Sequence, residues 1–234
     1  MIMKTMRNLT VVGITTLMVC ALSACGGSGN DSNASNNVPT EGILGELPAL
    51  NVKYLAEQEQ MRFDIENEAN ADKLTKLNKE FAEWEENRKV KLNEVLEALN
   101  GKEVPTEVAE GVPFSLDSNL KLYKVPSIVG YRKAQGILAK TTGKTTDKLS
   151  DMSELPNFTY VPYDNDGNVI ELVSSTSPQL KTHVNIMAAL PVGTECEFSA
   201  TIHSDEAWAK FAKIVIMDKR SDTYKQIEAQ FKNQ

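Results

Sequence analysis

The longest segment without glycine or proline constrains the fold of this chain most. Residues 51–100 contain neither residue type and are rich in Glu, Lys, Ala, Leu and Gln, which have high helix propensities. Asn100 and Gly101 close the segment with a pair typical of a left-handed helix C-cap. The sequence therefore predicts a long helical region over residues 50–100.

Apolar residues follow a helical period in both halves of this region. The second half carries a stripe on one helix face, made of Leu74, Leu77, Phe81, Trp84, Arg88, Leu92, Val95 and Leu99. A shorter stripe comprises Tyr54, Met61 and Ile65, and the polar residues 67–72 separate the two stripes, which are out of phase. The region is either one helix with a slip or a helical hairpin. Because hairpin turns usually contain Gly or Pro, we expect one continuous helix of about 75 Å.

The longer stripe needs a cover, because soluble proteins rarely expose apolar patches that contain residues such as Phe81 and Trp84. Two arrangements would provide it. The stripe packs against the rest of the same chain, or it forms a coiled-coil contact with a second copy or a partner protein. The sequence leaves both arrangements open.

Beyond the proline-containing linker 104–113, the apolar pattern changes from helical to alternating. Apolar residues alternate with polar ones over 184–190 and 196–202, and residues 158–163, 169–173 and 214–217 are short strand candidates. From Asp222, a possible N-cap, Tyr224, Ile227 and Phe231 follow a helical spacing. The predicted fold class is α+β. The long N-terminal helix, possibly a hairpin, precedes an antiparallel β-sandwich or open barrel over residues 105–234, which ends in a short helix.

The segment Asp164-Asn165-Asp166-Gly167-Asn168 invites comparison with a calcium-binding loop. An EF-hand loop has Gly at its sixth position and oxygen ligands at its first and twelfth. With Gly167 at the sixth position, those ligands would be Pro162 and Val173, which have no side-chain oxygen. The Asp-Gly pair between two apolar runs instead predicts a β-hairpin turn.

His183 and His203 are the only two histidines. If the strands around Gly193 form a hairpin with matched apolar faces, the two histidines lie opposite each other, with Cβ atoms roughly 5 Å apart. The alternative is two solvated histidines on strands that are not neighbours. A zinc site needs a third protein ligand, and Glu197 and Asn185 only share the same face. We therefore predict no metal site.

Sequence motifs for catalysis and cofactor binding are absent. The chain has no Gly-x-Ser-x-Gly, no Ser-x-x-Lys and no Cys in a known spacing from His. Phosphate-binding glycine loops are also missing, and the many acidic residues of the helical region are typical of a solvated face. We predict no catalytic residue and no cofactor, and we favour a non-enzymatic role while leaving activity open.

The N-terminus has the layout of a secretory signal, with Lys4 and Arg7 before an apolar run over residues 9–19. The run is too short for a permanent membrane span. Leu22-Ser23-Ala24-Cys25 follows, and this order resembles the lipobox of bacterial lipoproteins. The resemblance implies a signal peptide over 1–24, a diacylglyceryl group on Cys25, and acylation of the new N-terminus. By the same resemblance, Gly26 in place of Asp implies an outer-membrane location, on the periplasmic face or the cell surface.

Composition indicates the character of the segment after Cys25, the class of partner and the state of Cys196. The polar residues 26–40 predict a lipidated flexible tether over 25–45. Losing Lys4 and Arg7 changes the net charge from −7 to −9, which disfavours nucleic acid as a partner. Cys20 leaves with the signal and Cys25 is lipidated, so Cys196 has no disulfide partner and is expected to be a buried small hydrophobe.

These observations favour one function over two alternatives. We expect a lipid-anchored envelope protein that binds the membrane through Cys25 and serves as a non-enzymatic binding or scaffold module. The helical stripe would contact a partner protein or a second copy. The alternatives are an envelope hydrolase with a cleft between the helix and the β domain, and a small-ligand carrier. Residues 41–234 resemble no family.

Overall fold

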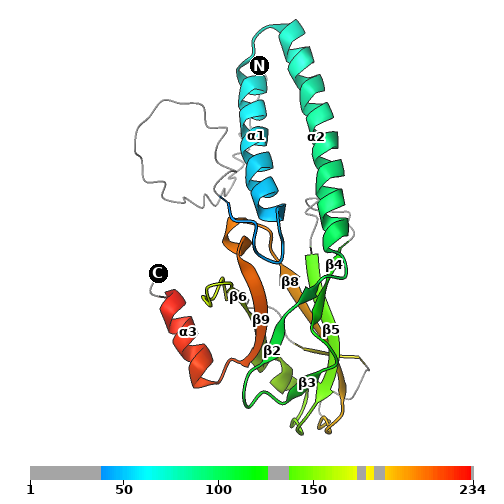
Figure 1. The fold of residues 1–234 in the computed structure, drawn as a ribbon, viewed down its shortest axis with the longest axis vertical. Coiled ribbons are helices and arrows are strands. Elements are labelled where there is room, and N and C mark those ends of the chain that lie inside the picture. Colours follow the sequence, from blue (N-terminus) through cyan, green and yellow to red (C-terminus); the bar gives the residue numbers. More distant parts are fainter. Residues whose placement is uncertain (1–37, 126–136, 173–177, 182–187, 233–234) are drawn as a thin grey trace, which may run out of the picture. The chain divides into compact units, whose positions relative to one another are not determined.

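The computed structural model describes residues 38–125, 137–172, 178–181 and 188–232 (Figure 1). The helices are α1 (Leu47–Asn67), α2 (Ala71–Leu99) and α3 (Asp222–Lys232), with 3₁₀ turns η2 (Met152–Asn157) and η3 (Glu206–Trp208). The strands are β1 (Glu103–Val104), β2 (Thr106–Val108), β3 (Phe114–Leu116), β4 (Leu120–Lys124), β5 (Ile137–Thr145), β6 (Phe158–Asp164), β7 (Gln179–Leu180), β8 (Glu195–Ile202) and β9 (Phe211–Asp218). The α+β class with a C-terminal helix is confirmed.

The helical region is a hairpin, so the expectation of one continuous helix is wrong. Residues 68–70 separate α1 from α2, which lie side by side and run in opposite directions (Figure 1). The Asn70 side chain accepts hydrogen bonds from the backbone N–H groups of Asp72 and Lys73, both at 3.1 Å. Glu68 in turn accepts one from the Asn70 N–H at 2.8 Å. These side chains satisfy the orphan N–H groups of a helix start, so the turn needs neither Gly nor Pro.

Two β-sheets follow the hairpin. In the larger sheet the strand order is β1-β4-β5-β8-β7, β3 also pairs with β5, and all pairs are antiparallel. The smaller sheet has the order β2-β9-β6, and β2 runs parallel to β9. The prediction of purely antiparallel strands is wrong for this pair. Roughly a hundred residues separate β2 from β9, so no hairpin fixes their relative direction.

The two sheets pack around one apolar core. Along β8 the predicted alternation is confirmed, because Cys196, Phe198, Ala200 and Ile202 are buried between more exposed neighbours. The Phe114 ring packs edge-on against Phe158 at 4.9 Å and against Phe198 at 5.4 Å. Aromatic rings from both sheets therefore fill the space between them.

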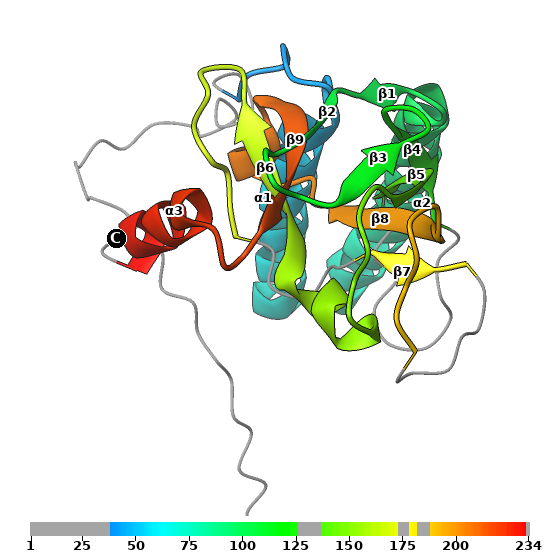
Figure 2. The same cartoon turned by 90° about the horizontal axis from the view of Figure 1, so that it is seen from below.

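The smaller sheet also packs on its other face. Val161, Val215 and Met217 form a second buried cluster with Tyr224 of α3, and Figure 2 shows α3 beside this sheet. Burial on both faces explains why β6 and β9 are almost continuously apolar. The predicted C-terminal helix is confirmed, but Asp222 is its first residue and the cap is Ser221, whose hydroxyl accepts from the Tyr224 N–H at 3.2 Å.

Residues 42–44 pack against the sheets, so the predicted tether over 25–45 is wrong in this part. Val38 and Leu44 are buried, and the Ile43 N–H donates to the Phe211 carbonyl at 2.8 Å. A Cβ atom at Gly42 would lie 2.3 Å from the Ala209 carbonyl oxygen. Glycine is therefore required for this close approach. Residues 25–37 lie outside the described part of the chain.

The base of the hairpin is fixed to the sheets through both helices. In α1, the Asn51 side-chain amide donates to the carbonyl and the hydroxyl of Ser204, at 2.8 and 2.7 Å. In α2, Glu97 pairs with Lys124 of β4 at 2.7 Å. Burial of Leu99 at the end of α2 adds an apolar contact to this junction.

Candidate functional site

The contact between α1 and α2 contains an aromatic cluster, which we call the hairpin seam: Tyr54, Glu57, Phe81, Trp84 and Arg88. The Trp84 ring lies edge-on to Tyr54 at 6.1 Å and stacked on Phe81 at 5.7 Å. Its Nε1–H donates to Glu57 at 2.8 Å, and the Arg88 guanidinium lies 5.2 Å from its ring. The stripe on α2 is thus covered by α1, which confirms packing within the chain.

The cover is incomplete. The five residues of the hairpin seam are only half-buried, whereas Val95 and Leu99 at the base are buried. Two helices shield each other along one line only, so both open sides of the hairpin seam stay accessible. Burial, followed by the nearby Glu57 carboxylate, raises the pKa of Tyr54. The Nε atom of Arg88 is buried and has no hydrogen-bond partner among the described residues.

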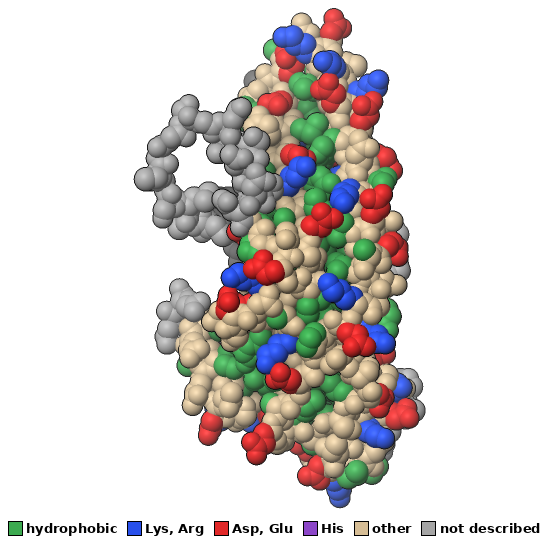
Figure 3. Space-filling view, viewed as in Figure 1, with side chains coloured by type: hydrophobic (Ala, Val, Ile, Leu, Met, Phe, Trp, Pro, Cys, Tyr) green, Lys and Arg blue, Asp and Glu red, His purple; other side chains and the backbone are tan. Residues whose placement is uncertain are grey.

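The two helices differ in what they present to solvent. Charged pairs cover the outer side of α2, including Lys76–Glu80 at 3.5 Å and Lys79–Glu83 at 3.7 Å. In α1, by contrast, Leu55 and Phe63 are 58% and 62% exposed. Figure 3 shows apolar side chains in a line along the hairpin, with charged side chains on either side.

A groove of about 370 Å³ lies at the base of the hairpin, where the cleft of a hydrolase was expected. It is lined by Leu44, Gly45, Glu46, Lys91, Glu94, Val95, Ala98, Leu99 and Lys102. Glu46 pairs with Lys91 at 3.0 Å, and this hydrogen bond raises the pKa of Lys91. The lining contains no Ser, Cys or His. This groove therefore offers an ion pair and apolar walls rather than a nucleophile with a base.

The interior where a small-ligand carrier would hold its ligand is occupied by side chains. Phe114, Phe158 and Phe198 meet between the sheets, and each is at most 4% exposed. The groove at the hairpin base lies outside this aromatic cluster. These observations give the carrier interpretation no support from the described residues.

His203 is exposed and stacks on the buried Trp208 ring at 5.6 Å. Glu171 contacts both residues, with Oε1 3.7 Å from His203 Nε2 and Oε2 accepting from Trp208 Nε1 at 3.4 Å. His183 lies outside the described residues. Across residues 38–125, 137–172, 178–181 and 188–232, no group of three or more His, Cys, Asp or Glu side chains is arranged to hold a metal ion.

The hairpin around Gly193, one of the two arrangements considered for the histidines, is not formed by residues 188–190 and β8. Its register would place Leu190 opposite Cys196, but Leu180 of β7 occupies that position. Leu190 instead pairs with Leu149. Residues 184–187 of the predicted strand 184–190 lie outside the described residues, so only the pairing of Leu190 is established.

The turn predicted at residues 164–168 is confirmed. Gly167 has a φ of +83°, and one Asp164 oxygen accepts from the N–H groups of Asp166 and Asn168, at 2.9 and 2.7 Å. Its other oxygen accepts from the Asn168 side chain at 3.1 Å. Although its burial acts in the opposite direction, these hydrogen bonds hold the pKa of Asp164 below its usual value. The Asp164 carboxylate thus stabilises the turn.

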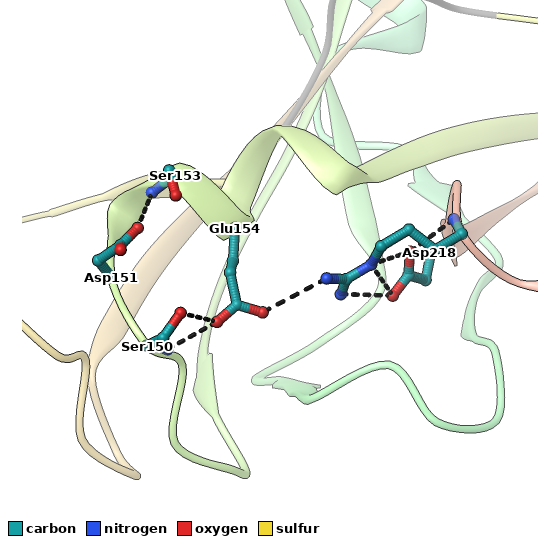
Figure 4. Close-up of polar contacts among 6 residues, drawn as sticks. Ser150, Asp151, Ser153, Glu154 and Asp218 are labelled. Carbon is teal, nitrogen blue, oxygen red and sulfur yellow. Dashed lines mark hydrogen bonds and ion pairs between the residues drawn. The ribbon is translucent and has the colours of Figure 1, made fainter.

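A polar cluster that the sequence did not reveal joins η2 to the end of β9 (Figure 4). Ser150 donates to Glu154 through its N–H and its hydroxyl, at 2.7 and 2.5 Å. Arg220 lies 3.6 Å from Glu154 and makes two hydrogen bonds to Asp218 through Nε and one through Nη2, the last at 2.7 Å. The guanidinium also lies 5.7 Å from the Phe158 ring. The residues of this cluster are about 65 positions apart in the sequence, so no local sequence motif predicts it.

Cys196 is buried, as expected for a cysteine without a partner. Burial raises the pKa of its thiol to about 11. The thiol is therefore almost fully protonated at neutral pH, which makes it a poor nucleophile. Cys25 and the lipobox lie outside the described residues.

Comparisons with known proteins return no relative. No family model matches the chain, and neither a curated protein nor a solved structure is similar to it. A search of the described residues for helices both long and apolar enough to span a bilayer identifies none.

Proposed function

We propose that this chain is a lipid-anchored protein of the bacterial cell envelope that acts as a non-enzymatic binding or scaffold module. In this proposal Cys25 carries the lipid and the helical hairpin α1–α2 is the partner-binding surface. The binding role of the hairpin rests on one observation, the position of the large apolar side chains that are exposed. Among described residues, Leu55, Phe63 and Val90 of the hairpin are exposed, with only Tyr123 and Val192 elsewhere.

The composition of the hairpin seam supports the same role. Trp, Tyr and Arg dominate the energetic centres of protein interfaces, and the seam places Trp84, Tyr54 and Arg88 together, half-buried. A further helix or strand laid along the hairpin would bury the remaining exposed parts of these side chains. Such burial contributes about 25 cal/mol per Å² of apolar surface.

The proposed anchor keeps this surface near a membrane. Cys25 lies about 13 residues before Val38, the first packed residue, so the connection reaches at most roughly 45 Å when fully extended. Partners would then be proteins of the same membrane or of its immediate surroundings.

Site-specific photo-crosslinking in intact cells tests the binding role. A photoreactive phenylalanine replaces Phe63 or Val90 on the hairpin, and the matched controls carry it at Tyr123 or Val192, which are also exposed. We expect protein adducts from the hairpin positions and few from the controls. Adducts confined to the control positions, or adducts from none of the four, would contradict the proposal.

A further inference from the structure

The outer face of the smaller sheet carries buried apolar side chains, which we call the outer cluster: Val161, Val215 and Met217. Helix α3 lies beside this sheet (Figure 2). Among its described residues, Tyr224 is buried in the outer cluster and Ile227 is partly buried against it. Phe231 follows at the same helical spacing and is half-buried, but it does not pack against the outer cluster. Two side chains of an 11-residue helix therefore make this contact.

The polar contacts of α3 in the described part of the chain stay within the helix and the residue before it. One ion pair joins Asp222 to Lys225 at 3.9 Å, and another joins Glu228 to Lys232 at 3.2 Å. The backbone N–H of Tyr224 donates to the hydroxyl of Ser221. The contact between α3 and the smaller sheet is therefore mainly apolar.

The chain just before α3 is fixed, and this locates a hinge. Arg220 contacts Asp218 at 2.7 Å and Glu154 at 3.6 Å, which ties the end of β9 to η2 (Figure 4). The Ser221 N–H donates to the Asp218 carbonyl at 3.0 Å. Helix α3 starts at the next residue. A rotation of the backbone at Ser221 would therefore lift the whole helix without moving β9.

The stability of α3 depends on the sheet, whereas the core of the sheets does not depend on α3. Isolated helices shorter than about 12–15 residues are marginal in water, so α3 is expected to lose its helical structure once it leaves the sheet. Ile214 and Ile216 of β9 point into the core between the two sheets, while Val215 and Met217 point to α3. Removing α3 therefore leaves the core side chains in place.

We propose that α3 is a releasable cover, which leaves the outer cluster as one unit while both sheets stay folded. Local opening of this kind is expected for elements that have few buried contacts. Release would expose the outer cluster, with Tyr163, Val169 and Leu172 of other segments remaining packed at its edge. The opened chain would present an apolar surface on the smaller sheet that the closed chain covers. This inference depends neither on the lipid nor on the binding role of the hairpin.

Thiol labelling of a soluble chain that begins at Gly26 tests the proposal. Every described helix and strand lies within residues 38–232, in one compact unit over 32–234, so this chain retains the whole described fold. Its only cysteine, Cys196, is buried in the core between the sheets. Met217→Cys adds a second thiol under α3. A small disulfide reagent, with mass spectrometry of the digested peptides, then compares the two sites in one molecule.

The thiol at position 217 should react at least about 30-fold faster than Cys196, because opening of α3 exposes the first and only unfolding of the core exposes the second. Ile227→Ala removes part of the contact and should speed labelling at position 217 about tenfold. Gln226→Ala is the matched control on the exposed side of α3, and it should change that rate less than about twofold.

A core substitution separates local opening from global unfolding. Ile137→Val in β5 alters a core side chain that is 2% exposed. It should speed labelling of Cys196 about fivefold, because it destabilises the core. The rate at position 217 should change less than about twofold, since the core is intact in both the closed and the opened chain.

Hydrogen exchange of the chain without any substitution gives an independent measurement. The backbone N–H groups of residues 226–232 in α3 should be protected at least about 30-fold less than those of β8. Four results would overturn the proposal: equal labelling rates at position 217 and Cys196, equal acceleration of both by Ile137→Val, an effect of Ile227→Ala no larger than that of Gln226→Ala, or equal protection of α3 and β8.

Discussion

At the scale of single residues, charged side chains that the sequence pattern did not distinguish hold the fold together. Asp218 accepts hydrogen bonds from both the backbone and the side chain of Arg220. Its side chain is 19% exposed, so these bonds are poorly replaced by water. Burial alone would raise the pKa of Asp218, but the contacts with Arg220 outweigh it and hold the pKa below its ordinary value.

Asp218→Asn should lower the free energy of unfolding by about 1–2 kcal/mol at pH 7, because it removes charge-assisted hydrogen bonds. A carboxyl with a depressed pKa stabilises the fold above its unfolded pKa of about 3.9, and this stabilisation is lost as the pH falls through the lower, folded pKa. Urea unfolding at pH 7 and at pH 3 measures it. A difference between the two proteins that grows on acidification would contradict the assignment.

Cys196 gives a second residue-scale prediction. In the soluble chain from Gly26 it is the only cysteine, and burial raises the pKa of its thiol to about 11. At pH 8 the folded chain should react with iodoacetamide about 100-fold more slowly than the unfolded chain, whose thiol has a pKa near 8.5. Equal rates in folding buffer and in denaturant would show that the thiol is accessible.

At the scale of elements, a helix or strand could be predicted where its own side chains determine it, but not where contacts with distant residues do. β8 and α3 were predicted because their apolar residues repeat with the period of their own element. The break between α1 and α2 was located at the polar residues 67–72, but a slip within one helix was expected there instead of a turn. Glu68 and Asn70 allow the turn without glycine, because their side chains accept hydrogen bonds from backbone N–H groups. The β2–β9 pairing depends on residues far apart in the chain.

Asn70→Ala should destabilise the hairpin by about 1 kcal/mol, because it removes the side-chain cap from two N–H groups of α2. Asn78→Ala is the matched control, since Asn78 lies inside α2 and only bonds the Leu74 carbonyl. It should be neutral or slightly stabilising, as Ala is the better helix former. Hydrogen exchange at the start of α2 measures the effect. Slower exchange in Asn70→Ala would indicate that α1 and α2 merge into one helix.

The candidate site was predicted in part. The stripe of α2 was identified from its period, and its cover by α1 was one of the two arrangements left open. The exposed apolar residues of α1 were missed because Leu55 and Phe63 do not fit the stripe of Tyr54, Met61 and Ile65. Their exposure becomes informative only when the position of α2 is known. An apolar residue outside a helical stripe carries no signal by itself.

At the scale of the whole molecule, the proposed lipid anchor at Cys25 and the exposed apolar side chains of the hairpin belong to one chain. The described part of the chain begins with the buried Val38, nine residues before the start of α1 at Leu47. The lipid on Cys25 would confine the hairpin to a layer near the membrane. Confinement raises the effective concentration of neighbouring membrane proteins, so a weak contact between the hairpin and a partner would be strengthened at the membrane.

Mass spectrometry of the protein purified from the membrane fraction of its own cells tests the central claim most directly. We predict that the first peptide starts at Cys25 and carries a diacylglyceryl thioether together with an amide-linked acyl chain. A first peptide with an unmodified Cys25, or one that still includes residues 1–24, would contradict it.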